Sequence, residues 1–275
     1  TDIPVATSRN VSTTAFALPD SPSVPLDVIE RADDRVLLAG YTVTDESVVD
    51  ALVAAGRRNV SVRVLVDESP VGGTSETQIA LLDRLRGAGI EVTAIGGPRA
   101  RYAFHHAKYA VGDETVLVTS ENWKPAGVGG HASRGWGVAL QDESLASHLH
   151  QVYTADAEWE DGRSWDVVDP EGQASDLSDG DFPTRFEPVR SSTTTASVIV
   201  APDNAERELV RLLGNASDSI RIQQVSVDPD GPLLEESIEA ARRGVTVRLL
   251  LGGAWYVEEE NRALARNLST MAASE

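Results

Sequence analysis

Five polar residues in the middle of the chain have types and spacing that suit chemistry at a phosphate group. His106, Lys108 and Asp113 form the pattern H-x-K-x-x-x-x-D, and Ser120 and Asn122 follow it. If this segment is extended, the side chains of His106 and Lys108 point to one face of a sheet, because strand side chains alternate. A neutral imidazole can attack phosphorus, and an ammonium group beside it can hold a non-bridging phosphate oxygen.

Lysine is rare in this chain, which makes Lys108 informative. Lys108 and Lys124 are the only two lysines, and the remaining cationic side chains, histidine aside, are arginines. An ammonium group is a compact point charge, whereas the guanidinium of arginine is a wide planar fork. The pattern therefore indicates that Lys108 acts beside His106 at a position where a compact cation is needed. Ser120 and Asn122, again two residues apart, would add hydrogen bonds to the same phosphate.

The composition indicates a protein adapted to high salt. The chain has 43 acidic and 24 basic residues, a formal charge of −19, and its acidic residues are spread along the sequence. Such a charge weakens the compact state at low salt, but at about 1 M salt the Debye length falls to roughly 3 Å and screens it. An ordinary acidic protein is the alternative, which accounts for the charge but not for the scarcity of lysine.

Other compositional features exclude some classes of site and leave the compartment open. There is no cysteine, which excludes disulfides, thiolate metal sites and a cysteine nucleophile. No run of about 18 apolar residues is present, so the sequence predicts no transmembrane segment. The first residues lack the apolar core of a signal peptide. The sequence leaves open whether an export signal precedes Thr1. It also leaves the location open, and an extracytoplasmic or membrane-associated one is among the possibilities.

The order of apolar patterns predicts an α/β fold with a largely parallel sheet. Short β-branched runs predict strands at 36–43, 60–66, 90–95, 116–119 and 135–140, and helical spacing predicts helices at 47–55, 77–85 and 143–159. We expect an N-terminal lead at 1–22, a first repeat at 23–159, a polar linker at 160–196 and a partial second repeat at 197–275.

An internal similarity supports the two repeats. ERADDRVLLAGYTVT (30–44) resembles GNASDSIRIQQVSVD (214–228), and AAGRRNVSVRVLVD (54–67) resembles AARRGVTVRLLLG (240–252). Both pairs lie at nearly one offset, 184 or 185 residues, which two unrelated βα units would not share. The sequence therefore predicts a duplication whose second copy is incomplete.

At these residues the chain resembles the phospholipase D superfamily, whose defining motif is H-x-K-x-x-x-x-D with a downstream Ser-x-Asn. The resemblance implies a duplicated α/β/α sandwich, no metal or other cofactor, and a phosphodiester substrate. With the composition, it suggests a phospholipase D-like protein of haloarchaeal character. In that family one histidine becomes covalently phosphorylated or phosphatidylated, and a histidine from a second motif protonates the leaving group and then activates water or an alcohol.

Carried over by position, the resemblance implies catalytic roles for His106, Lys108 and Asp113. His106 is the nucleophile or else its acid/base partner, Lys108 and Asn122 bind phosphate, and Ser120 supports them. Asp113 is expected to shape its loop and the local charge rather than to take a proton itself.

Two departures from the family pattern affect these expectations. Adding the 185-residue offset to His106 places a second motif near position 291, beyond Glu275. Family members with one motif form a two-fold dimer, so a homodimer is expected if no second motif follows. The partial second repeat instead favours a truncated two-motif chain. The family also often places a carboxylate on the strand after Ser-x-Asn to orient the histidine, and Gly137 occupies that position here. A histidine without this partner has a less fixed tautomer.

The substrate is left open between several phosphodiesters. Phospholipid hydrolysis, phosphatidyl transfer, cardiolipin-type synthesis and nucleic-acid cleavage all use this constellation. A nuclease is less favoured because no basic cluster flanks the motif beyond Arg99 and Arg101, although salt adaptation weakens that argument. A non-catalytic phosphate-binding or envelope module is the alternative from another class. Trp123 and Trp136, which flank the motif strands, are candidates to line a substrate groove.

Overall fold

The computed structural model describes residues 3–98, 100–165 and 185–274, and all structural statements concern these residues. They form two compact units, Ala6–Val198 and the combination of Thr1–Val5 with Ile199–Glu275. Arg99 and residues 166–184 of the predicted linker lie outside the described residues. No helix in the described ranges combines the length and apolar character that a membrane span requires.

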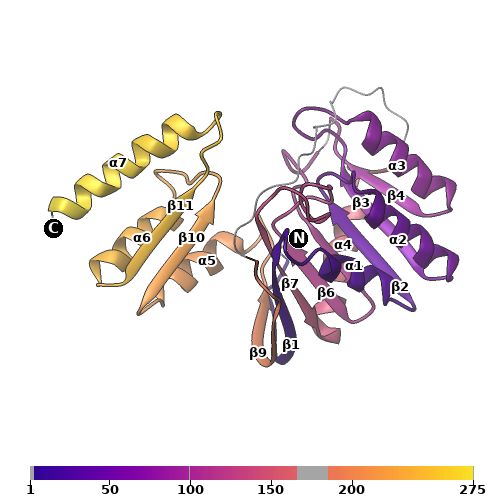
Figure 1. Ribbon diagram of the computed structural model, residues 1–275, viewed down its shortest axis with the longest axis horizontal. Helices are drawn as coiled ribbons and strands as arrows, with labels where there is room; N and C mark the ends of the chain where they lie inside the picture. Colours follow the sequence, from indigo (N-terminus) through magenta and orange to yellow (C-terminus); the bar gives the residue numbers. More distant parts are fainter. Residues whose placement is uncertain (1–2, 99, 166–184, 275) are drawn as a thin grey trace. The chain divides into compact units, whose positions relative to one another are not determined.

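A nine-stranded mixed sheet is the centre of unit Ala6–Val198 (Figure 1). Its spatial order is β8 (Gly162–Ser164), β4 (Glu91–Ile95), β3 (Ser61–Asp67), β2 (Arg35–Gly40), β5 (Tyr109–Gly112), β6 (Thr115–Thr119), β7 (Gly135–Gln141), β1 (Ala6–Leu18) and β9 (Val189–Val198). Only β2–β3 and β3–β4 pair in parallel, and the other neighbouring strands are antiparallel. The expectation of a largely parallel sheet was therefore wrong, because β5, β6 and β7 follow one another as hairpins without crossover helices.

Helices cover both faces of this sheet and give an α/β/α sandwich. Helices α1 (Ser23–Glu30), α2 (Glu46–Arg57) and α3 (Glu76–Gly87) pack on one face, and α4 (Glu143–Ala157) packs on the other. The last three begin at side-chain caps: Asp45, Ser75 and Asp142 each accept a hydrogen bond from a backbone N–H three residues on, at 3.0, 3.2 and 3.0 Å.

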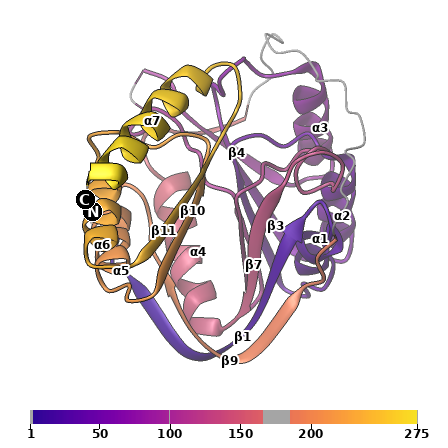
Figure 2. The ribbon, with the colours of Figure 1, turned by 60° about the vertical axis from the view of Figure 1, so that its left-hand side comes forward.

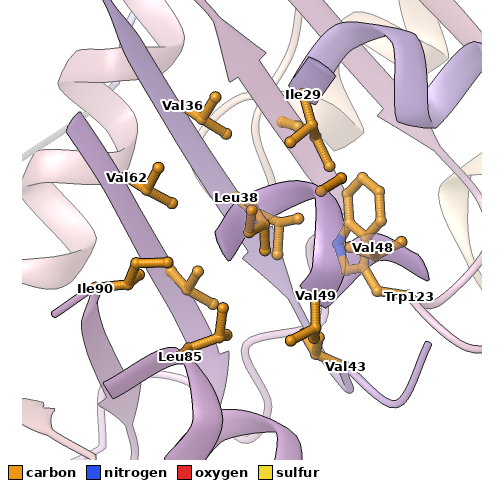
Figure 3. Packing of buried hydrophobic residues seen from close by; sticks show 14 of the residues in the cluster. Ile29, Val36, Leu38, Val43, Val48, Val49, Val62, Leu85, Ile90 and Trp123 are labelled. Carbon is orange, nitrogen blue, oxygen red and sulfur yellow. The ribbon is translucent and has the colours of Figure 1, made fainter. Parts of the chain in front are cut away.

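The main core lies between the sheet and helices α1 to α3 (Figure 3). Alternate residues of β2, such as Val36 and Leu38, point into it and are fully buried, as are Val48 and Val49 of α2. Trp123 is also fully buried there, and its indole nitrogen donates to the Ala39 carbonyl at 2.9 Å. Trp123 is thus a core residue, and the suggestion that it lines a substrate groove was wrong.

The strands predicted from β-branched runs are confirmed as β2, β3, β4, β6 and β7, while β1 and β9 were not predicted. Both lie in Ser/Thr-rich sequence, one within the predicted lead and one mostly within the predicted linker. β1 pairs with β9 along residues 6–15 and with β7 along residues 12–18, so only its middle has strand neighbours on both sides. Threonine suits a pleated strand, and polar side chains are tolerated where the strand is half exposed.

The second unit repeats the order of elements at the start of the first. Helix α5 (Ala205–Gly214), strand β10 (Ser219–Gln224), helix α6 (Pro232–Arg242), strand β11 (Thr246–Leu251) and helix α7 (Glu258–Ser274) follow one another (Figure 2). β10 and β11 pair in parallel, as β2 and β3 do. Ile220, Ala240 and Val245 form its small buried core.

Candidate functional site

The predicted site residues lie at one edge of the nine-stranded sheet. β2, β3 and β4 end at this edge, the antiparallel β5 begins there after His106 and Lys108, and β6 ends there before Ser120 and Asn122. The β5–β6 ladder extends past the strands themselves, since the Thr119 N–H donates to the Lys108 carbonyl at 3.1 Å. Four of the five predicted residues are therefore brought to one edge by backbone pairing.

His106 is exposed and is placed by an aromatic contact. Its ring lies edge-on to the ring of Tyr41, the residue that follows β2, with 4.6 Å between ring centroids. Partial burial, and then the nearby charge of Lys108, lower the pKa of His106 below its ordinary value of 6.5. At neutral pH the imidazole is therefore uncharged, which is the form that a nucleophile requires.

Lys108 is buried although it is cationic. Its side chain donates from Nζ to the His106 carbonyl at 2.7 Å, and Nζ lies 5.5 Å from the centroid of the Tyr41 ring. Burial lowers the pKa of Lys108 to about 8, an effect that Glu121 opposes. The Tyr41 ring thus contacts both His106 and Lys108, and sequence reasoning did not identify it, because Tyr41 is far from the motif along the chain.

Ser120 and Asn122 lie just beyond the end of β6. Ser120 pairs with Trp136 of β7: its N–H donates to the Trp136 carbonyl at 2.9 Å, and its hydroxyl accepts from the Trp136 N–H at 3.0 Å. The Asn122 amide oxygen is buried and makes no hydrogen bond within the described chain. Trp136 remains about half exposed, at 49 % of its surface, beside Ser120.

Asp113 is placed away from the other four. It occupies the two-residue turn between β5 and β6 with φ of +50°, and the length of β5 separates it from Lys108, roughly 13 Å of extended chain. Its carboxylate accepts three backbone hydrogen bonds, from Asp33 at 2.7 Å, Asp34 at 3.1 Å and Arg35 at 2.8 Å. Burial alone would raise the pKa of Asp113, but these hydrogen bonds lower it. This geometry suits an aspartate that shapes a loop.

A side chain at position 137 would collide with Phe16 unless that ring moved. A Cβ atom there would lie 2.1 Å from Cζ of Phe16, the residue paired with Gly137 across β1 and β7. Phe16 is buried, so its ring fills the position where the family pattern suggested an orienting carboxylate.

His105 belongs to a buried network on the other side of the motif. Its N–H donates to Asp67 at 2.6 Å, and its ring nitrogen Nε2 lies 3.8 Å from a carboxylate oxygen of Asp156. Burial, and then Arg101 and Lys108, lower the pKa of His105 to about 4. Arg101 also pairs with Asp161 at 3.0 Å, which anchors the segment that leads into the motif. His105 therefore has the packing role expected from its opposite-facing position.

Exposed apolar side chains stand around this edge. Phe104 is 46 % exposed and its ring meets that of Tyr41 edge-to-face, with 6.1 Å between centroids. Val71 is 76 % exposed, and its N–H donates to the Tyr41 hydroxyl. In the described ranges, no group of three or more acidic or histidine side chains is arranged to hold a metal ion.

Comparison with known proteins relates part of the chain to a known family. Residues 26–157 match the family model described as cardiolipin synthase, PLD-like domain. This segment begins in α1 and ends in α4, so it contains the whole edge described above. The segment makes up a little under half of the chain and is similar to the phospholipase D-like domain. No curated protein matches the chain in sequence.

Several solved structures are similar to parts of this chain. Nuc from Salmonella typhimurium, a phospholipase D family member, is 22% identical, with 59% of this chain and 99% of that chain covered and a TM-score of 0.48. Polyphosphate kinase from Porphyromonas gingivalis is 16% identical, with 87% of this chain and 37% of that chain covered and a TM-score of 0.56. Phosphatidylserine synthase from Haemophilus influenzae is 10% identical, with 59% and 40% covered and a TM-score of 0.44. The similarity to polyphosphate kinase shows a shared fold over most of this chain. The matched part makes up little more than a third of that kinase.

Proposed function

We propose that this protein is a phosphodiesterase that works through a covalent phosphohistidine on His106. The observation that carries the proposal is the pairing of an uncharged, exposed imidazole with a buried ammonium group two residues away. The imidazole attacks phosphorus and forms a P–N bond while the P–O bond to the leaving alcohol breaks. Lys108 and Asn122 hold the non-bridging oxygens, and Ser120 supports them.

The cycle needs a proton donor for the leaving alcohol. It also needs a proton acceptor when water or a second alcohol attacks phosphorus, forms a P–O bond and breaks the P–N bond to His106. We assign both tasks to a second imidazole, from a second subunit or a second motif. A homodimer would place two copies of His106 at one site, and sedimentation in molar KCl measures whether it forms.

A phospholipid is the favoured substrate, by hydrolysis or phosphatidyl transfer. The exposed side chains of Val71 and Phe104 give the edge an apolar border next to His106, which suits an amphiphilic phosphodiester. The net charge of −19 disfavours a polyanion, although a nuclease of the same superfamily remains the alternative substrate class. The non-catalytic phosphate-binding or envelope module is the alternative without turnover.

The test is turnover of a bis-aryl phosphodiester in molar KCl, where the acidic surface is screened. We expect His106→Asn to lower kcat by at least about 1,000-fold, because no nucleophile remains. His150→Asn, on helix α4, is the matched control and should leave kcat within about twofold. Alkaline quenching and mass spectrometry should find an arylphosphoryl group on His106 in the unchanged protein, since one of the two aryl groups stays on phosphorus. Equal turnover by His106→Asn and the unchanged protein would overturn the nucleophile assignment.

A comparison of substrates then separates the alternatives. Faster release of headgroup from anionic or zwitterionic phospholipid vesicles than cleavage of single-stranded DNA supports the lipid assignment, and the reverse supports the nuclease. Binding of inorganic phosphate without turnover of any phosphodiester supports the binding module.

A further inference from the structure

Glu121, between the two predicted phosphate ligands Ser120 and Asn122, is a half-buried carboxylate that the motif pattern does not assign. The ladder between β6 and β7 runs through Thr119 with Gly137 and continues with Ser120 and Trp136. One further step in the same register sets Glu121 opposite Gly135, at the start of the strand after Ser-x-Asn.

The Glu121 side chain occupies space that a side chain at Gly135 would need. A Cβ atom on Gly135 would lie 2.2 Å from Cγ and 2.5 Å from Oε1 of Glu121. A Cβ atom on Gly127 would likewise lie 3.0 Å from both Cβ and Oε2 of Glu121. Two glycines therefore leave room for this carboxylate, which lies over the strand where the family pattern expects one.

Glu121 also lies next to the motif on its other side. The β5–β6 ladder pairs Tyr109 with Val118 and continues through the bond between Lys108 and Thr119. The backbone N–H of Glu121 in turn donates to the Thr119 hydroxyl at 3.2 Å, so Glu121 follows the residue opposite Lys108 by two positions. The charges of Lys108 and Glu121 interact, and each shifts the pKa of the other group.

The electrostatics of the pair agree with this placement. Burial raises the pKa of Glu121, and the charge of Lys108 lowers it. Burial lowers the pKa of Lys108 to about 8, and Glu121 raises it. Lys108 donates to the His106 carbonyl rather than directly to Glu121, so the carboxylate acts on the ammonium through the electric field.

We propose that Glu121 is a positioning residue that places a negative charge beside Lys108 and keeps this ammonium group protonated for phosphate binding. Its link to turnover rests on the proposed function, whereas its effect on Lys108 does not. Without Glu121, the buried ammonium would lose its proton at a lower pH, and the site would lose its cation near neutrality.

The presence of only two lysines makes a direct measurement possible. Protein labelled with ¹³C-lysine gives two sets of Cε signals, from Lys108 and Lys124, and Lys124→Arg assigns them. We expect the Lys108 signal to titrate with a midpoint of about 8 in the unchanged protein. In Glu121→Gln the Lys108 midpoint should move to lower pH, and the Lys124 midpoint should stay fixed.

Gly135→Ala tests the same idea without touching the carboxylate. The new methyl group should displace the Glu121 side chain and lower the Lys108 midpoint, and in a Glu121→Gln background it should add little, because the two changes act on one interaction. Glu121→Asp should restore part of the effect. The matched control is Glu114→Gln, the same charge change at the opposite end of the β5–β6 hairpin, which should leave Lys108 unaffected.

Kinetics then connect Lys108 to turnover. In Glu121→Gln we expect kcat/KM for the bis-aryl phosphodiester to fall about fivefold at pH 8 and little at pH 6, since only the protonated fraction of Lys108 changes. An unchanged Lys108 midpoint in both Glu121→Gln and Gly135→Ala would overturn the positioning role. A shifted midpoint in a protein without turnover would uphold that role and reject the proposed function instead.

Discussion

Two regions of this chain follow the same order of elements and differ in what surrounds them. The region from α1 to α3 contains β2 and β3, and the region from α5 to α7 contains β10 and β11. The parallel pairs have nearly the same spacing, with Arg35 opposite Ser61 in one and Ser219 opposite Thr246 in the other. This agreement supports the duplication predicted from the sequence.

Burial separates the two regions. Leu37 and Leu65 of the first pair are buried, because α4 covers that face of the large sheet. At the corresponding positions of the second pair, Arg221 is exposed and Leu250 is 63 % exposed. A βαβ unit thus keeps its internal geometry with one face covered, whereas the first region gains its second covered face from strands and a helix that come later in the chain.

The two regions also differ in their relation to the five motif residues. None of the five motif residues belongs to the αβαβα unit itself, since they lie on or beside the β5–β6 hairpin added to its edge. The unit contributes Tyr41, whose counterpart by position is the exposed Val225. The αβαβα unit therefore provides a framework, and the β5–β6 hairpin carries the motif residues on it or beside it.

The largest difference in stability should come from exchanging the last residues of β2 and β10. A Cβ atom on Gly40 would lie 2.5 Å from Cδ1 of buried Trp123, whereas Gln224 is exposed at the corresponding position. We expect Gly40→Gln to lower the free energy of unfolding of unit Ala6–Val198 by more than about 3 kcal/mol, and Gln224→Gly to lower that of its own unit by about 1 kcal/mol. Hydrogen exchange with mass spectrometry measures the stability of each unit separately. Equal losses of free energy of unfolding in the two variants would contradict the difference in packing between the two regions.

Truncating a leucine at equivalent positions should give the next largest contrast. Leu65→Ala leaves a cavity in a filled core and should cost about 3 kcal/mol. Leu250→Ala removes a mostly exposed side chain and should cost less than about 1 kcal/mol. Urea unfolding followed by the same exchange measurement checks both. A large loss for Leu250→Ala would mean that its face is covered in solution.

The smallest effect should be a gain in stability at the site. Lys108→Met removes a buried charge and should raise the free energy of unfolding at pH 7 by about 2 kcal/mol, after the loss of one hydrogen bond is counted. Lys124→Met, the only other lysine substitution available, should change it by less than about 0.5 kcal/mol.

The pH dependence of that gain follows from the lowered pKa of Lys108. Between its folded value of about 8 and the ordinary value of 10.5, the unfolded chain keeps the lysine proton while the folded chain has lost it. Stability of the unchanged protein therefore rises with pH in this window relative to Lys108→Met, and the advantage of the variant disappears near pH 10.5. An advantage that persists at pH 10.5 would show that it does not come from the charge.

Much of the scaffold could be predicted because it is local. Alternation of apolar residues in 60–66 and helical spacing in 47–55 gave elements close to β3 and α2. The positions of β1 and β9 could not be predicted, because Ser/Thr-rich strands owe their stability to neighbours that are distant in sequence.

The part of the candidate site that could be predicted is also local in sequence. The spacing of His106 and Lys108 placed them together, as did that of Ser120 and Asn122, because residues two apart share a strand face. Tyr41 and Glu121 could not be assigned, since their roles depend on which strands pair and on the missing side chain of Gly135. The rings of Phe16 and Trp123 fill space beside glycines, a relation that exists only in three dimensions.

The carboxylate of Asp113 has a consequence for the order of folding. Its bonds to residues 33–35 close loops of 78 to 80 residues, and the pairing of β5 with β2 closes loops of 70 to 76 residues, with β3 and β4 in between. Such distant pairings are slow to form, because chain entropy is lost before contacts compensate for it. We expect the parallel strands to form first and the hairpin to dock onto them later. His106 and Lys108 would then reach their final positions only in the last stage of folding.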